Sequence, residues 1–117
     1  MADSIKVYHN PRCSKSRQTM ELLSEKGVQT DVIEYLKTPP SKKDLQGILN
    51  MLGLQPRQLM RTHEAEYKDN NLADVSLTPD QLIDAMVKFP KLIERPIVVS
   101  NGKAAIGRPP ENVLEIL

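Results

Sequence analysis

The chain of 117 residues has one cysteine, no tryptophan, one phenylalanine and three tyrosines. A single thiol cannot form a disulfide within the chain, which fits a reducing compartment. Few aromatic rings are present for stacking on bases, and the 16 basic residues are interspersed with 15 acidic ones without a long basic block. We therefore expect no nucleic-acid partner.

Long hydrophobic runs are also missing. No stretch approaches the roughly 18 consecutive apolar residues of a transmembrane helix. The first ten residues, MADSIKVYHN, lack the apolar core of a signal peptide. These absences predict a protein that does not enter a membrane, and they predict a cytoplasmic localisation.

The first third of the sequence has the pattern of a strand, a helix and a second strand. Residues 5–9 (IKVYH) alternate apolar and polar side chains, residues 14–26 have helical spacing, and residues 28–36 form another strand-like run. A strand, a helix and a strand of these lengths predict a right-handed crossover between two parallel strands.

The middle of the chain has a helical pattern. One helix is expected to begin near Ser41, and residues 56–68 are expected to form another. A third is expected from Thr78, because a capping Thr, a proline in the first turn and Gln81 three residues later are typical of a helix start. Together these segments predict an inserted helical region over about residues 41–90.

The last third returns to strands. Residues 95–100 (RPIVVS) and 103–107 (KAAIG) flank Asn101-Gly102, a dipeptide typical of tight hairpins, and residues 108–117 predict a final helix. The order βαβ, helical insertion, ββα predicts an α/β thioredoxin-like fold with a mixed sheet, in which residues 1–117 form one domain. The order of elements supports a fold and not a function.

Cys13 lies in a polar, cationic segment, YHNPRCSKSR. If a helix begins at Ser14, the free backbone N–H groups of its first turn favour an anion at Cys13. With Arg12, Lys15 and Arg17 nearby, the pKa of the thiol is expected to be lowered, which predicts a reactive thiolate. The alternative is an unused thiol beside a solvated helix start.

Two sequence motifs restrict the chemistry of Cys13. Residue 16 is serine, so the motif is C-x-x-S and contains no second thiol to resolve a disulfide. The phosphatase loop C-x5-R would need arginine at position 19, which is Thr19. An external thiol must therefore release whatever Cys13 attacks. Cys13, His9 and His63 do not have the spacing of a metal site, so no metal is expected.

Four motifs in order, YHNPRCSKSR, LMRTHE, LIERPIVV and IGRPPE, resemble the glutaredoxin-coupled arsenate reductase family nearly from end to end. The resemblance implies that Cys13 is the nucleophile and that three arginines bind the oxyanion, namely Arg61, Arg95 and Arg108. Planar guanidinium groups suit arsenate better than lysine does. Taken alone, Arg61 is more typical of a surface charge.

The resemblance implies further roles close to the nucleophile. His9 and Ser16 match positions that assist thiolate formation, although His9 by itself is equally typical of a structural histidine. Pro96 matches the proline that precedes the third strand of the thioredoxin-like fold and commonly has a cis peptide bond. His63 matches no role and is taken as a surface residue.

The implied reaction is the reduction of arsenate to arsenite. Cys13 attacks arsenate, glutathione acts as co-substrate, and glutaredoxin completes the cycle, so no bound cofactor is expected. Two alternatives remain. One is a glutathione-dependent thiol reductase of the same superfamily. The other is a regulator that binds RNA polymerase, although such regulators typically carry C-x-x-C, and Ser16 departs from that pattern.

Overall fold

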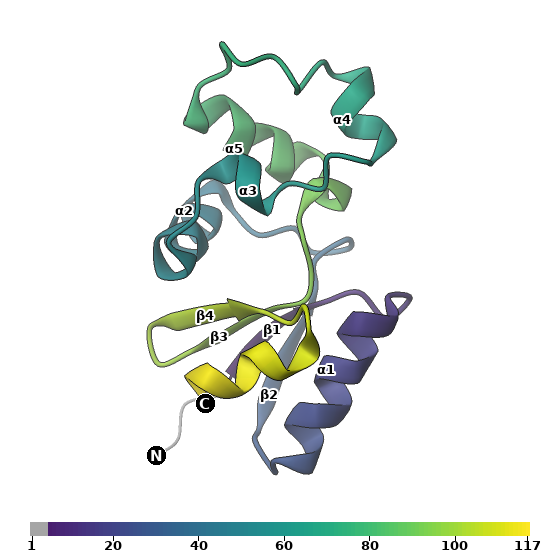
Figure 1. Cartoon of the computed structure of the whole chain (residues 1–117), viewed down its shortest axis with the longest axis vertical. Coiled ribbons are helices and arrows are strands. Elements are labelled where there is room, and N and C mark those ends of the chain that lie inside the picture. Colours follow the sequence, from purple (N-terminus) through teal and green to yellow (C-terminus); the bar gives the residue numbers. More distant parts are fainter. Residues whose placement is uncertain (1–4) are drawn as a thin grey trace. The chain divides into compact units, whose positions relative to one another are not determined.

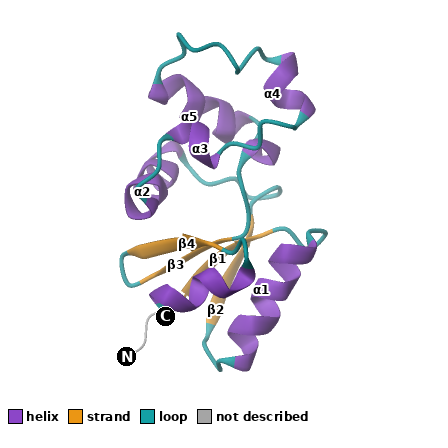
Figure 2. Cartoon of the chain, in the orientation of Figure 1, coloured by secondary structure: helices purple, strands orange, loops and turns teal. Residues whose placement is uncertain are grey.

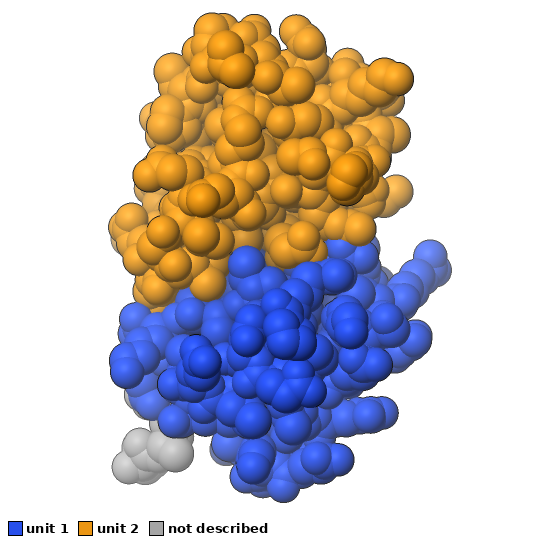
Figure 3. Space-filling model, viewed as in Figure 1, with its two compact units in different colours: residues 1–38, 95–117 blue, residues 39–94 orange. Residues whose placement is uncertain are grey.

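The structure is a computed structural model that describes residues 5–117. The chain divides into two compact units, shown in Figure 3: unit 1 consists of the segment that ends at Thr38 and the segment Arg95–Leu117, and unit 2 is Pro39–Glu94. The predicted helical insertion falls within unit 2. That residues 1–117 form one domain stays a prediction, and its first four residues lie outside the described part of the chain.

Unit 1 contains a four-stranded mixed sheet, drawn as orange arrows in Figure 2. The strands follow the order β2-β1-β3-β4. Their bounds are Ile5–His9 for β1, Thr30–Glu34 for β2, Ile97–Ser100 for β3 and Lys103–Ile106 for β4. The first two strands run parallel, and the other two neighbouring pairs are antiparallel. This arrangement confirms the predicted mixed α/β sheet of thioredoxin-like order.

Two helical segments cover the sheet of unit 1. They are α1 (Ser14–Glu25) and the 3-10 helix η2 (Pro110–Ile116), which lie side by side in Figure 1. Leu23 of α1 and Val113 of η2 join Val7 and Val98 of the central strands in one buried cluster. Burial of these side chains fixes α1, and with it the position of its N-terminus, against the end of β1.

The hairpin between β3 and β4 has the predicted two-residue turn. Asn101 has φ +53° and Gly102 has φ +76°, so both central residues are left-handed, as a type I′ turn requires. The turn fixes the register in which Ile97 faces Ile106. The turn therefore also determines which residues of the two strands face each other beyond Ile97 and Ile106.

Unit 2 is helical. Its elements are α2 (Lys42–Leu52), α3 (Pro56–Leu59), α4 (Ala65–Asp69), α5 (Pro79–Lys88) and the 3-10 helix η1 (Pro90–Leu92). The predicted cap of α5 is present, because the Thr78 hydroxyl accepts from the Gln81 N–H and the Gln81 side chain accepts from the Thr78 N–H. The buried side chains include Leu45, Leu59 and Met86.

The prediction of one helix over residues 56–68 is wrong. The helix stops at Leu59 because the next residues pair with a distant segment: Met60 forms an isolated antiparallel bridge with Ile93. The Arg61 N–H donates to the Leu92 carbonyl at 2.7 Å. A helical course resumes only at Ala65.

Smaller differences concern the ends of elements. The second strand covers residues 30–34 instead of 28–36, and the third begins at Ile97 instead of at residue 95. The Arg95–Pro96 peptide bond is cis, as the resemblance led us to expect, and the Arg108–Pro109 bond is cis as well. The final helix is of the 3-10 type.

None of the helices formed by residues 5–117 has both the length and the apolar character needed to cross a bilayer.

Gly102→Ala should lower the free energy of unfolding by about 1 kcal/mol, because a Cβ atom is strained at a left-handed φ. The matched control is Gly47→Ala, within α2, where an added Cβ meets nothing within 4 Å. There alanine should raise stability by about 0.5–1 kcal/mol, because glycine in a helix costs conformational entropy. Denaturant titration of both variants measures the difference. A shift of the same sign in the two would contradict the role given to the turn.

Candidate active site

Cys13 occupies the N-cap position of α1, with the extended backbone angles φ −92° and ψ 125°. Its N–H donates to the Asn10 carbonyl at 3.0 Å, and its own carbonyl accepts from the Arg17 N–H at 3.0 Å. The Asn10 side-chain oxygen in turn accepts from the Arg12 N–H at 3.0 Å. The loop between β1 and α1 is therefore held by its own hydrogen bonds, and these fix where the thiol lies.

The pKa of the Cys13 thiol is lowered by its surroundings. Burial of the thiol raises its pKa, but four other influences outweigh this cost. The backbone N–H groups of Ser16 and Lys15 stabilise the thiolate, as expected at a helix N-terminus, and so do the positive charges of Arg95 and Arg108. The charges that lower the pKa thus come from far along the chain and not from Arg12 or Arg17.

Arg108 contacts the sulfur directly. Its Nη2 atom lies 3.5 Å from Cys13 Sγ, and its Nε donates to the Arg95 carbonyl at 2.8 Å. One guanidinium group therefore joins the thiol to the loop that precedes β3. The N–H of Gly107 donates to the Pro96 carbonyl at 3.0 Å, which extends the pairing of β3 and β4 by one step toward the site.

Gly107 lies in close contact with α1. A Cβ atom at this position would be 2.5 Å from Thr19 Oγ1 and 2.8 Å from Pro96 Cγ, both shorter than real contacts allow. Thr19 is fully buried on α1, and its hydroxyl donates to the Lys15 carbonyl at 2.9 Å. Only glycine lets the segment that carries Arg108 approach the helix that carries Cys13 this closely.

His9 and Ser16 form a hydrogen-bonded pair beneath the loop. His9 Nδ1 lies 2.7 Å from Ser16 Oγ, which also accepts from the Asn10 N–H at 3.0 Å. Burial lowers the pKa of His9, against an opposing effect of the Glu34 charge, so the ring is neutral near pH 7. The Ser16 hydroxyl thus supports the loop, whereas its backbone N–H stabilises the thiolate.

Arg61 belongs to unit 2, whereas the other predicted site residues belong to unit 1. It lies in the extended segment after α3 and not on the helix that the sequence suggested. Its Nη1 forms an ion pair with Glu64 Oε1 at 3.2 Å. A neighbouring arginine, Arg57, donates to the Leu72 carbonyl and to the Tyr67 hydroxyl, which is a structural role within unit 2. The role of Arg61 in oxyanion binding stays a prediction.

Unit 1 brings most of the predicted residues together, although their catalytic roles stay predictions. Residues that the sequence analysis did not single out also contribute: Asn10, Thr19 and Gly107. The signal for Gly107 was present, because a glycine directly before a candidate arginine in IGRPP indicates a close backbone approach. Thr19 carried no such signal, since a threonine in an amphipathic helix is usually exposed.

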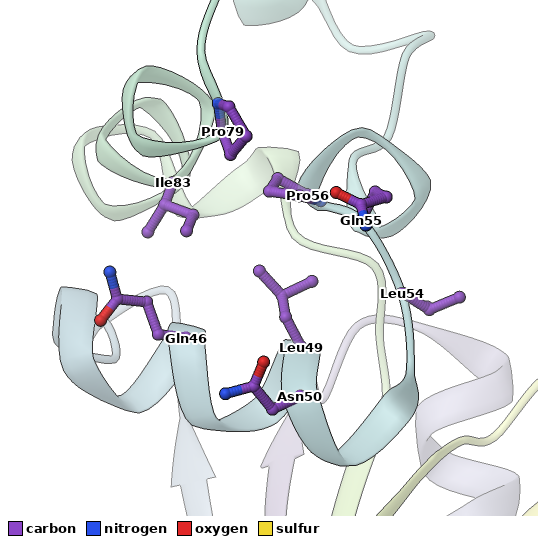
Figure 4. A pocket seen from close by; sticks show the side chains of 8 residues that line it. All are labelled: Gln46, Leu49, Asn50, Leu54, Gln55, Pro56, Pro79 and Ile83. Carbon is purple, nitrogen blue, oxygen red and sulfur yellow. The ribbon is translucent and has the colours of Figure 1, made fainter.

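A hollow within unit 2 does not suit an anion. It is lined by side chains that are all either amides or apolar, as Figure 4 shows. Among the residues that the structure describes, no group of three or more His, Cys, Asp or Glu side chains could hold a metal ion. The Cys13 surroundings are therefore the candidate site.

Comparison with protein families identifies relatives over nearly the whole chain. The model of the ArsC family matches residues 8–116, nearly the whole chain. The chain is 58% identical over 118 residues to a protein of Escherichia coli K12 called "Uncharacterized protein YfgD", with 100% of this chain and 99% of that protein covered. It is 48% identical over 114 residues to a protein of Neisseria meningitidis serogroup A called "Arsenate reductase", with 97% of each covered.

Comparison with solved structures also finds relatives that cover the whole chain. The structure called "Arsenate reductase from Vibrio cholerae" superposes on this one with a TM-score of 0.96 at 53% sequence identity. The superposition covers 100% of both chains. The thioredoxin-like fold predicted from the order of elements is therefore confirmed.

Arg108→Ala should raise the pKa of Cys13, because it removes a charge and a donor from the thiolate. The rate of alkylation by iodoacetamide, measured against pH, rises as the thiolate forms and so reports this pKa. In the wild type the midpoint should lie below the usual value of about 8.5, and in the variant it should move toward that value. Arg17→Ala removes an equal charge from the first turn of α1 and should leave the midpoint in place. Equal midpoints for wild type and Arg108→Ala would refute the contact.

Gly107→Ala should raise the same midpoint and cost about 1–3 kcal/mol of stability, as overpacking of a filled site does. Adding Thr19→Ala removes the oxygen at 2.5 Å and should restore part of both losses, whereas adding Thr19→Ser keeps that oxygen and should restore little. Alkylation and denaturant titration of the two double variants give the comparison. Equal recovery with alanine and with serine would mean that Thr19 Oγ1 is not the obstacle.

Proposed function

Since the chain belongs to the ArsC family, we propose that it is an arsenate reductase and that Cys13 is its nucleophile. The observation that carries the proposal is the contact between Arg108 Nη2 and Cys13 Sγ, at 3.5 Å, on a thiol whose pKa is lowered. A thiolate beside a guanidinium group can meet an oxyanion without net repulsion.

Arsenate would bind where positive charge and N–H donors converge on the sulfur. Arg95 and Arg108 both act electrostatically on Cys13, so an oxyanion beside the thiolate would contact the same two charges. The first backbone N–H groups of α1 would supply further donors. Arg61 is proposed as the third arginine, on the basis of the resemblance alone.

The first chemical step is nucleophilic. The thiolate of Cys13 attacks arsenic, a sulfur–arsenic bond forms, and an arsenate oxygen leaves as water after protonation. The guanidinium groups would stabilise the negative charge that the arsenate oxygens carry in the transition state. His9, neutral and bonded to Ser16, would hold the loop in place through this step.

The second stage needs an external thiol. Glutathione would displace a second oxygen and bind arsenic through its own sulfur. Both sulfur–arsenic bonds would then break as Cys13 and glutathione form a disulfide; each sulfur loses one electron, and arsenic gains two and leaves as arsenite. Glutaredoxin would remove the glutathione from Cys13. The support for this route is the single cysteine of the sequence, with serine at position 16.

No bound cofactor or metal has a part in this scheme, since glutathione is consumed as a co-substrate. The scheme also requires a compartment in which glutathione stays reduced, for which the cytoplasm is the proposed location.

Arsenite production from arsenate, glutathione and glutaredoxin tests the proposal. Cys13→Ser should abolish turnover, because a serine hydroxyl is not ionised at neutral pH. Arg95→Ala should lower turnover about 100-fold, the size typical for loss of one oxyanion donor. Arg17→Ala, which removes an equal charge, should retain most of the activity. Wild-type protein that forms glutathione mixed disulfides but no arsenite would instead be a glutathione-dependent thiol reductase.

A further inference from the structure

Unit 1 contains a hollow on the side of the Cys13 loop that faces β2. It lies between the segment that follows β1 and the segment that follows β2. Its wall includes Pro11 and Arg12 from the first segment and Leu36 and Lys37 from the second. The last residues of the two strands, His9 and Glu34, complete it. No step of the proposed arsenate chemistry uses Arg12, Leu36 or Lys37.

The sheet explains why these two segments meet. Strands β1 and β2 are parallel, with His9 facing Glu34 at their last paired position. The chain therefore leaves both strands at the same end of the sheet, beyond the carboxyl ends of the strands, where ligands of α/β folds commonly bind. Arg12 lines the hollow and directly precedes Cys13 in the sequence, so the hollow borders the loop that carries the nucleophile.

The charges around the hollow follow a defined pattern. Arg12 and Lys37 supply two positive charges, and Glu34 supplies one negative charge. Lys37 Nζ and Glu34 Oε1 lie 3.7 Å apart, with 78% and 44% of their side chains exposed. An ion pair this exposed is weak, so both groups remain able to contact a ligand. Pro11 and Leu36 supply apolar surface between the charges.

Another hollow of unit 1 provides a contrast. It lies between α1 and η2, and its wall includes Glu21, Glu25 and Glu111. Three carboxylates repel an anionic ligand, and the hollow borders the middle and the end of α1 instead of its start. The hollow beside Arg12 thus combines two cations with a position against the loop that carries the nucleophile.

We propose that this hollow binds glutathione for its reaction at Cys13. Glutathione carries two carboxylates and one ammonium group, which complement Arg12, Lys37 and Glu34 in number and in sign. The inference rests on the proposed function, because that function makes glutathione the co-substrate. The bound tripeptide presents its sulfur to the arsenic held on Cys13, from the side of β1 that faces β2.

Thiol–disulfide exchange tests the site without arsenate. The Cys13 thiolate attacks one sulfur of glutathione disulfide, the sulfur–sulfur bond breaks, and a mixed disulfide forms as one glutathione thiolate leaves. The same rate is measured with bis(2-hydroxyethyl) disulfide, which is neutral. The ratio of the two rates removes any change in the pKa or the accessibility of Cys13.

Arg12→Gln and Lys37→Gln should each lower this ratio about twofold to fivefold, the range expected for loss of one exposed charge contact. The double variant should lower it about tenfold. Lys26→Gln, just beyond the other end of α1, removes the same charge and should leave the ratio unchanged. An unchanged ratio in the double variant overturns the proposal.

Glu34→Gln separates a tripeptide site from general attraction of anions. The comparison uses 3,3′-dithiodipropionate, a disulfide with carboxylates and no ammonium group. If Arg12 and Lys37 only attract anions, removal of the Glu34 charge speeds exchange with both anionic disulfides. A glutathione site predicts slower exchange with glutathione disulfide and faster exchange with dithiodipropionate. Faster exchange with both would overturn the proposal.

These rates are independent of arsenite formation. The wild-type protein could lack arsenate turnover while its glutathione selectivity still depends on Arg12, Lys37 and Glu34. That result would support the glutathione site and contradict the proposed function. Arsenate turnover, with an exchange ratio that does not depend on these residues, would support the proposed function and contradict the glutathione site.

Discussion

The register of the three strands β1, β3 and β4 determines how the candidate site is assembled. Tyr8 faces Ile97 across the first antiparallel pair, and Ile97 faces Ile106 across the second. The next pair beyond Ile97 and Ile106, toward the end of β1, is Pro96 and Gly107. The pair after that is Arg95 and Arg108. A slip of one residue would turn the side chains of a strand to the opposite face. The type I′ turn that sets this register therefore also determines the surroundings of Cys13.

Within this frame, the pKa of Cys13 results from two opposing effects. Burial of the thiol favours the neutral form, and in isolation it would make the sulfur a poor nucleophile. Backbone N–H groups at the start of α1 and two guanidinium groups reverse that preference. The contribution of Arg108 requires close approach of its segment to α1, which explains why a glycine stands at position 107. The partial burial also strengthens the interaction of the sulfur with the arginines, because less water screens the charges.

The parts of the fold that sequence reasoning predicted are those fixed by local signals. Alternation of apolar residues predicted β1, the capping residues predicted the start of α5, and Asn101-Gly102 predicted the hairpin. The course of the chain around Arg61 could not be predicted in this way. Its backbone pairs with the Leu92–Ile93 segment, about thirty positions away, and a helical pattern in residues 56–68 contains no information about that partner. The contact of Arg108 with Cys13 likewise depends on pairing across the whole sheet, and only the resemblance indicated it in advance.

The order of the strands has a consequence for a protein with one thiol. Strand β1 lies between β2 and β3, so Arg95 and Arg108 reach Cys13 from one side of β1, and the hollow lined by Arg12 and Lys37 lies on the other. A resolving cysteine on the same chain would need no separate binding site, because its attack is intramolecular. In the proposed scheme, an external thiol has to be bound while the oxyanion still occupies the arginines. Separate sides of one central strand would allow both reactants to approach Cys13 without competing for the same positive charges.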